Sequence, residues 1–140
     1  MIVHLSLTTN GVGLEKKAQA LRDAGLKRIN ISLDTLHAER FKELTKRDKF
    51  SDVLAGIAAA KSAGLYPIKI NSVLMEGVNN DEVLDLVEWA YTEGLQLRFI
   101  EQMPLDAGDA WSRGKMVTAD QIHEAINKRY QLEALQNRGA

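Results

Sequence analysis

The same junction between a helix and a strand occurs three times in this chain. The segments AGLKRINIS (residues 24–32), AGLYPIKIN (63–71) and EGLQLRFIE (93–101) each place Gly-Leu between a helical pattern and a strand pattern. Glycine suits the end of a helix, because the left-handed conformation that often closes a helix costs it no steric strain. Repeated helix-to-strand units imply parallel strands joined by right-handed crossovers. The chain is therefore predicted to be an α/β protein.

Hydrophobic periodicity places the elements around these junctions. Ser51 is predicted to cap the longest helix, and Thr118 with Gln121 is predicted to form a capping box. Residues 106–115, DAGDAWSRGK, are predicted to be a loop. The expected order is strand 3–9, helix 14–24, strand 28–33, helix 38–45, helix 51–63, strand 67–74, helix 80–92, strand 95–101 and helix 119–129.

Each predicted strand has one apolar side and one polar side, because side chains alternate across a strand. The apolar side, which we expect helices to cover, carries Leu5, Leu7, Ile29, Ile31, Leu33, Ile68, Ile70, Leu95, Leu97 and Phe99. The opposite side carries Ser6, Thr8, Asn10, Asn30, Ser32, Asp34, Lys69, Asn71, Gln96, Arg98 and Gln102. Strands of a doubly wound sheet meet helices on both faces and are apolar throughout, so one polar side favours a barrel whose strands face a lumen.

The number of strands limits how much of a barrel the chain can form. A closed eight-fold barrel takes about 250 residues, and this chain has 140. We therefore expect a partial TIM-type (βα) barrel with four parallel strands, spanning residues 1–130, and a disordered tail at 131–140. A partial barrel has two open edges, which predicts self-association into a homo-oligomer.

A buried polar group without a partner costs about 1 to 3 kcal/mol, so the polar side of the strands needs an explanation. Two explanations are open at this point. The polar side chains pair with one another and with water, or they line a cavity that holds a large polar ligand.

Composition excludes several other classes of protein. With 18 basic and 19 acidic residues the net charge is −1, so we expect no nucleic-acid partner. No apolar run approaches the roughly 20 residues that span a bilayer, and Met1 to His4 do not resemble a signal peptide, so we expect no membrane partner and a cytoplasmic location. Because the chain has no cysteine, we expect neither disulfides nor a thiolate-held iron-sulfur cluster in it.

Four motifs in order resemble the radical S-adenosylmethionine enzymes, and among them the GTP 3',8-cyclases of molybdenum cofactor biosynthesis. They are LTTNG (7–11), INISLDTL (29–36), PIKINSVLMEGVN (67–79) and LRFIEQMP (97–104), and the resemblance extends to about Tyr130. It implies an incomplete six-fold barrel in which a 4Fe-4S cluster cleaves S-adenosylmethionine. The resulting 5'-deoxyadenosyl radical then takes a hydrogen from the ribose of GTP.

The resemblance also implies roles for individual residues. Thr8 and Lys69 correspond to GTP-binding positions, and Ser32 and the backbone around Met103 correspond to S-adenosylmethionine contacts. A lysine ammonium suits a phosphate, and the planar guanidinium of Arg98, which we add to the GTP-binding residues, suits the same group. The Ser32 hydroxyl can donate to a carboxylate and accept from an ammonium, the two groups at the amino acid end of S-adenosylmethionine.

This chain departs from the family at the iron-sulfur ligands. The family's three-cysteine motif and the cysteines of its second cluster have no counterpart here. No metal ligand or catalytic residue is therefore predicted in this chain, and we expect it to be inactive alone. The chain is predicted to be the central fragment of such an enzyme.

Other interpretations of the same residues stay open. Lys69 on an inward strand face is also typical of barrel aldolases that form a Schiff base, and a third possibility is a non-catalytic half barrel that self-associates. In a purely structural interpretation, Lys69 pairs with Asp34 or Glu101. The acidic residues Asp81, Glu82 and Asp85 are interpreted as the first turn of a helix, stabilised by its dipole, and not as a metal site.

Overall fold

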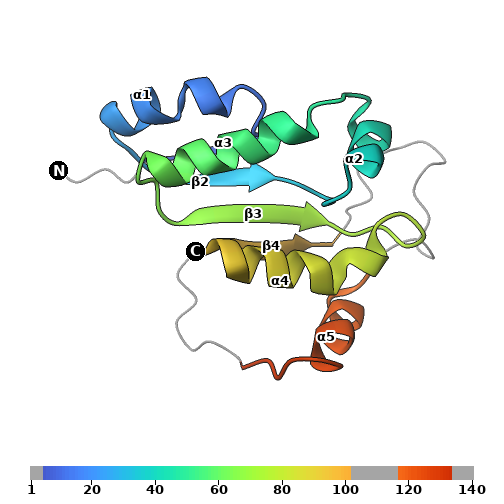
Figure 1. Cartoon of the computed structure of the whole chain (residues 1–140). Coiled ribbons are helices and arrows are strands. Elements are labelled where there is room, and N and C mark those ends of the chain that lie inside the picture. Colours follow the sequence, from blue (N-terminus) through green and yellow to red (C-terminus); the bar gives the residue numbers. More distant parts are fainter. Residues whose placement is uncertain (1–4, 102–116, 134–140) are drawn as a thin grey trace.

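The centre of the molecule is a four-stranded parallel sheet with the strand order β1-β2-β3-β4 (Figure 1). The computed structural model describes residues 5–101 and 117–133. The strands are β1 (Leu5–Thr9), β2 (Leu26–Ser32), β3 (Ile68–Val73) and β4 (Gln96–Ile100), and each neighbouring pair is parallel. The prediction of four parallel strands alternating with helices is confirmed.

One or two helical segments follow each strand. They are α1 (Ala18–Asp23), α2 (Ala38–Thr45), α3 (Phe50–Ser62), α4 (Val83–Glu93) and α5 (Ala119–Asn127), with 3-10 turns η1 (Leu14–Lys16) and η2 (Asn80–Glu82). The helix predicted at 14–24 is thus divided at Lys17 into a 3-10 turn and a short α-helix. Residues 106–115 and 134–140, for which a loop and part of a tail were predicted, lie outside the described residues.

The two predicted helix caps have different outcomes. The capping box is confirmed, because Thr118 Oγ1 accepts from the Gln121 backbone N–H at 3.2 Å and Gln121 Oε1 accepts from the Thr118 backbone N–H at 2.9 Å. The prediction that Ser51 caps the longest helix is wrong. Helix α3 begins at Phe50 after Lys49, without a side-chain cap, which places Ser51 inside the first turn.

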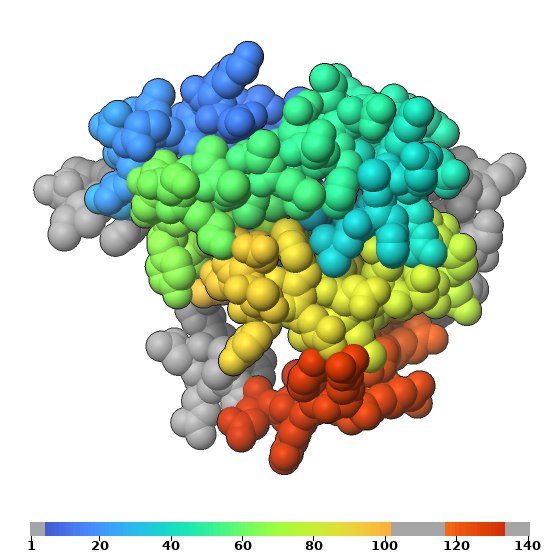
Figure 2. Space-filling model, viewed as in Figure 1, coloured from blue at the N-terminus to red at the C-terminus, as the bar shows by residue number. Residues whose placement is uncertain are grey.

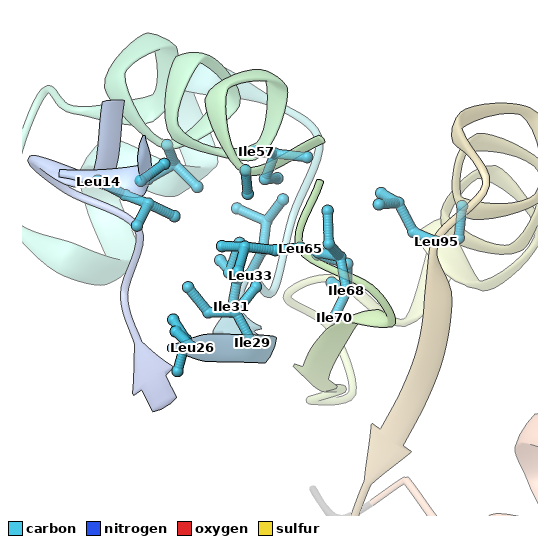
Figure 3. Packing of buried hydrophobic residues seen from close by; sticks show 14 of the residues in the cluster. Leu14, Leu26, Ile29, Ile31, Leu33, Ile57, Leu65, Ile68, Ile70 and Leu95 are labelled. Atoms are coloured by element: carbon cyan, nitrogen blue, oxygen red, sulfur yellow. The ribbon is translucent and has the colours of Figure 1, made fainter. Parts of the chain in front are cut away.

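The main hydrophobic core lies between the sheet and helices α1 to α3. Ile29 and Ile31 of β2 and Ile70 of β3 are fully buried, and Leu14 and Ile57 pack against this layer from the helical side (Figure 3). Burying an isoleucine or leucine side chain is worth about 1.5 to 3 kcal/mol. The predicted apolar side of β2 and β3 is therefore the side that anchors the helices.

The first strand differs from this pattern. Leu5 and Leu7 of β1 are 46% and 37% exposed, so the expectation that helices cover them is wrong. The reason is the position of α1, which packs on α3 and β2 instead. Strand β1 lies at one edge of the sheet, and its apolar side is only partly covered.

Helix α3 approaches the carboxyl end of β1 very closely. A Cβ atom added at Gly56 would lie 2.7 Å from the carbonyl oxygen of Gly11, which itself has a positive φ of 84°. Val53, one helical turn earlier, is fully buried against the same loop. Two glycines therefore let the helix fix the loop that follows β1.

A second, smaller core lies beside α4 and α5. Leu74, Leu86 and Ile122 are buried in it, with Phe99 of β4 packed against them. Figure 2 shows α3 and α4 side by side on the helical face and α5 at one side of it. Among residues 5–101 and 117–133, none of the helices has the length and apolar character needed to cross a membrane.

Candidate ligand-binding site

Polar side chains lie in two rows across the face of the sheet opposite the main core, which we call the polar face. In the first row Thr8, Asn30, Lys69 and Gln96 are direct neighbours in register. Adjacent strands lie about 4.8 Å apart, so Thr8 and Lys69 are separated by about 10 Å. Within this row, Asn30 Nδ2 donates to Thr8 Oγ1 at 3.5 Å.

The second row lies one residue pair nearer the carboxyl ends of the strands. Ser32, Asn71 and Arg98 are neighbours there, in that order. The parity of the sheet therefore brings Thr8, Ser32, Lys69 and Arg98, predicted from the sequence, to one surface. Met103 lies outside the described residues, and its predicted role is not tested.

The polar face is more open than the opposite side of the same strands. Thr8, Ser32 and Arg98 are exposed and Lys69 is half-buried, whereas the isoleucines between them are buried. The carboxyl ends of barrel strands are also where barrel sites are built. A hollow of about 130 Å³ lies at this end of β1 and β2, bordered by Asn10, Ser32 and Asp34 among others.

The cations of this face are not neutralised by the carboxylates considered from the sequence. Glu101 Oε1 accepts from the Ala119 backbone N–H at 2.8 Å, and Asp34 Oδ1 accepts from the Val73 backbone N–H at 2.8 Å. Within residues 5–101 and 117–133, neither Lys69 nor Arg98 takes part in an ion pair. The purely structural interpretation of Lys69 therefore has no support among these residues.

The rim of the site is held by Asn79, which is fully buried. Its Nδ2 donates to the carbonyl oxygens of Asp34 at 2.7 Å and Val73 at 2.9 Å, and its Oδ1 accepts from the Met75 backbone N–H at 2.7 Å. These bonds tie the ends of β2 and β3 together. Burial raises the pKa of the Asp34 carboxyl, and the hydrogen bond from Val73 opposes that shift.

Glu82 is a second buried anchor. It lies in the 3-10 turn at the start of α4, as the first-turn interpretation expects, but specific partners also hold its carboxylate. Its carboxylate accepts from Thr35 Oγ1 at 2.7 Å, from the Leu36 backbone N–H at 2.8 Å and from Arg40 at 2.9 Å. It thereby fixes the loop after β2, which carries the rim of the site. The sequence offered no signal for this role, because its partners lie more than 40 residues earlier.

Two polar atoms on the polar face have no hydrogen-bond partner among the described residues. They are Asn71 Oδ1 and Arg28 Nε, both buried. Sequence reasoning placed Asn71 on this face without giving it a role, and it did not single out Arg28. Only the three-dimensional environment shows that these atoms lack partners.

Four parallel strands alternating with helices, with one polar face, define an α/β barrel fragment. Residues 1–90 match the Radical SAM superfamily. The chain therefore belongs to the radical S-adenosylmethionine superfamily.

Three relatives of this chain carry the name GTP 3',8-cyclase. The chain is 56% identical to the GTP 3',8-cyclase of Streptomyces coelicolor over 93% of this chain and 38% of the relative. The GTP 3',8-cyclase of Corynebacterium glutamicum strain R is 52% identical over 99% of this chain and 37% of the relative. The GTP 3',8-cyclase of Mycolicibacterium smegmatis is 47% identical over 91% of this chain and 36% of the relative. The chain thus spans little more than a third of the length of these relatives.

The residues present fit one part of the family's chemistry and not the other. The polar face offers cations, hydroxyls and an unpaired buried acceptor, which suit a polar nucleotide-like ligand. A thiolate-held cluster does not fit this chain, because its sequence contains no cysteine.

Proposed function

We propose that this chain is the central part of an enzyme that converts GTP to 3',8-cyclo-7,8-dihydro-GTP by S-adenosylmethionine radical chemistry in molybdenum cofactor biosynthesis. The observation that carries the proposal is the convergence of the predicted ligand residues on one polar face. About 50% identity to proteins named GTP 3',8-cyclase supports it. The same identity favours a cyclase over a Schiff-base aldolase or a non-catalytic module.

In this proposal the residues of the polar face have two tasks. Lys69 and Arg98 bind the phosphates of GTP, with Thr8 as a further contact in the Lys69 row. Ser32, together with the backbone around Met103, binds the amino acid end of S-adenosylmethionine. The spacing of about 10 Å between Thr8 and Lys69, together with the partner-free ammonium of Lys69 among the described residues, supports a ligand of nucleotide size.

The 4Fe-4S clusters are proposed to be supplied by parts of the enzyme that correspond to the remaining length of the relatives. Bound there, a cluster would provide the electron that cleaves S-adenosylmethionine. This chain's own residues bind and orient the two ligands. After treatment with iron and sulfide, the chain alone is expected to form no 5'-deoxyadenosine.

A chimeric enzyme tests the proposal. This chain would replace the matching segment of the Streptomyces coelicolor cyclase, to which it is 56% identical. We expect the chimera to convert GTP to the cyclic product, and the Lys69→Ala chimera to lose most of that activity. A well-folded chimera that binds its clusters and forms no product would contradict the proposal.

We also propose that the chain self-associates through its sheet edges. Strand β1 leaves Leu5 and Leu7 exposed, and Ile100 of β4 is 37% exposed at the other edge. Exposed strand edges are templates for further pairing. A cytoplasmic location without nucleic-acid or membrane partners is proposed from the net charge of −1 and from the sequence pattern.

A further inference from the structure

We propose that Asn71 is a further ligand-binding residue, whose side-chain amide hydrogen-bonds a ribose hydroxyl of the bound nucleotide. The inference rests on the proposed function, because it assigns a specific contact within the same site.

The unpaired oxygen of Asn71 is one of two such buried side-chain atoms among the described residues, and the other is Arg28 Nε. The buried polar side chains of Thr35, Ser72, Asn79 and Glu82 all have hydrogen-bond partners. Asn71 Oδ1 is buried and has none among residues 5–101 and 117–133. Leaving such an atom unpaired costs about 1 to 3 kcal/mol, so the folded chain carries a cost that a ligand can remove.

The sheet itself does not need this side chain. The backbone of Asn71 already takes part in the ladder, since its carbonyl oxygen accepts from the Leu33 backbone N–H at 3.0 Å. The side chain stands between Ser32 and Arg98 in the second row and two residues beyond Lys69. Asn71 is therefore surrounded by the residues proposed to bind the two ligands.

The neighbours of Asn71 restrict the kind of group that it can bind. An oxygen acceptor needs a donor, and the donors of the proposed ligands are ammonium, amine and hydroxyl groups. An ammonium would lie beside the cations Lys69 and Arg98, which repel it. A hydroxyl carries no charge and meets no such penalty.

A hydroxyl also fits either orientation of the side-chain amide. Turning the amide by 180° exchanges its oxygen for its nitrogen, which is a donor. A hydroxyl can both donate and accept, so it satisfies Asn71 in both cases. Ribose hydroxyls occur in GTP and in S-adenosylmethionine, and separate titrations distinguish these two sources.

The test compares Asn71→Leu with the unaltered chain by thermal unfolding and by calorimetric titration with GTP and with S-adenosylmethionine. Leucine has a similar shape and removes the unpaired polar atom, so we expect an equal or higher unfolding temperature. We expect the affinity for one of the two ligands to fall by about 3- to 10-fold, the loss of one hydrogen bond. A purely structural residue would not show stability and affinity moving in opposite directions.

Ser72→Ala is the matched control. Ser72 is the next residue in β3, faces the core and donates its hydroxyl to the Leu33 carbonyl oxygen. Its substitution should lower the unfolding temperature and leave ligand affinity unchanged. Titration with 2'-deoxy-GTP and 3'-deoxy-GTP adds a second readout. If GTP is the ligand, the unaltered chain should bind the analogue that lacks the contacted hydroxyl more weakly than it binds GTP. Asn71→Leu should bind that analogue and GTP with equal affinity.

The outcomes separate this inference from the proposed function. If the unaltered chain binds neither GTP nor S-adenosylmethionine, the proposed function fails and the inference fails with it. If the unaltered chain binds a ligand and Asn71→Leu binds both ligands with unchanged affinity, the inference alone is overturned. A lower unfolding temperature for Asn71→Leu with unchanged affinity would identify Asn71 as a structural residue.

Discussion

The hydroxyl of Thr35 donates a 2.7 Å hydrogen bond to the carboxylate of Glu82, which lies 47 residues later in the chain. The same carboxylate accepts from the Leu36 backbone N–H, and it is completely shielded from solvent. Two segments that follow different strands are thus joined by a buried acid. This contact holds the loop after β2 in place beside Ser32.

Glu82→Ala is expected to destabilise the chain by about 3 kcal/mol, because Thr35 and Leu36 both lose their acceptor in a buried place. Chemical denaturation monitored by circular dichroism measures this loss. Asp81→Ala is the control, since Asp81 binds the same Arg40 but is 62% exposed. A loss for Glu82→Ala no larger than that for Asp81→Ala would contradict the role given to Glu82.

Gly56→Ala is expected to destabilise the chain by about 1 to 3 kcal/mol. Alanine normally stabilises a helix relative to glycine by up to about 1 kcal/mol, but here its Cβ would lie 2.7 Å from the Gly11 carbonyl oxygen. Ser51→Ala in the same helix is the control and should change stability by less than about 0.5 kcal/mol, because Ser51 makes no capping bond. A stabilising Gly56→Ala would show that the approach of α3 to Gly11 is looser than described.

Asp34 makes a predictable contribution to the pH dependence of stability. Burial raises its pKa above the ordinary value of 3.8, so the folded state binds a proton more tightly than the unfolded state. Stability from this group is therefore present at low pH and is lost as pH rises from 3.8 through the raised pKa. Asp34→Asn keeps an acceptor for Val73 and removes the ionisation.

We expect the stability of Asp34→Asn relative to the unaltered chain to increase with pH across that window and then to level off. Denaturant unfolding at a series of pH values measures the difference. Asp81 is present in both proteins, so its contribution to stability cancels in this difference. Arg40 lowers the pKa of Asp81, so the stability that Asp81 contributes is instead lost as pH falls below 3.8. A difference that does not change with pH would contradict the described burial of Asp34.

Leu7→Lys is expected to weaken self-association, because a charge on an edge strand opposes pairing with another sheet. Sedimentation velocity over a range of concentrations would show a shift from dimer or larger species toward monomer. Tyr91→Lys is the control, since Tyr91 lies on helix α4 and not on an edge strand, and is 87% exposed. A stable monomer at high concentration, or a dimer that resists Leu7→Lys, would exclude the proposed interface.

The alternation of polar and apolar residues predicted the polar face, because parity along a strand is a local property. It placed Thr8, Ser32, Lys69 and Arg98 on one surface, and the register confirms this placement. The role of Glu82 and the missing partner of Asn71 depend on contacts between distant segments, which periodicity does not contain. The hydrophobic pattern also did not predict the exposure of Leu7. That exposure depends on where α1 packs, and the sequence of α1 alone does not determine this position.

The most direct test of the central claim is a GTP titration of the unaltered chain, Lys69→Ala and Lys61→Ala by isothermal calorimetry. Lys61 is the matched control, because its ammonium is paired with Glu93 at 2.9 Å on the helical side of the molecule. We predict that Lys69→Ala weakens GTP binding by about 10- to 100-fold, the value of one charged hydrogen bond, and that Lys61→Ala leaves it unchanged. Equal GTP affinity in all three proteins would contradict the assignment of the polar face as the nucleotide site.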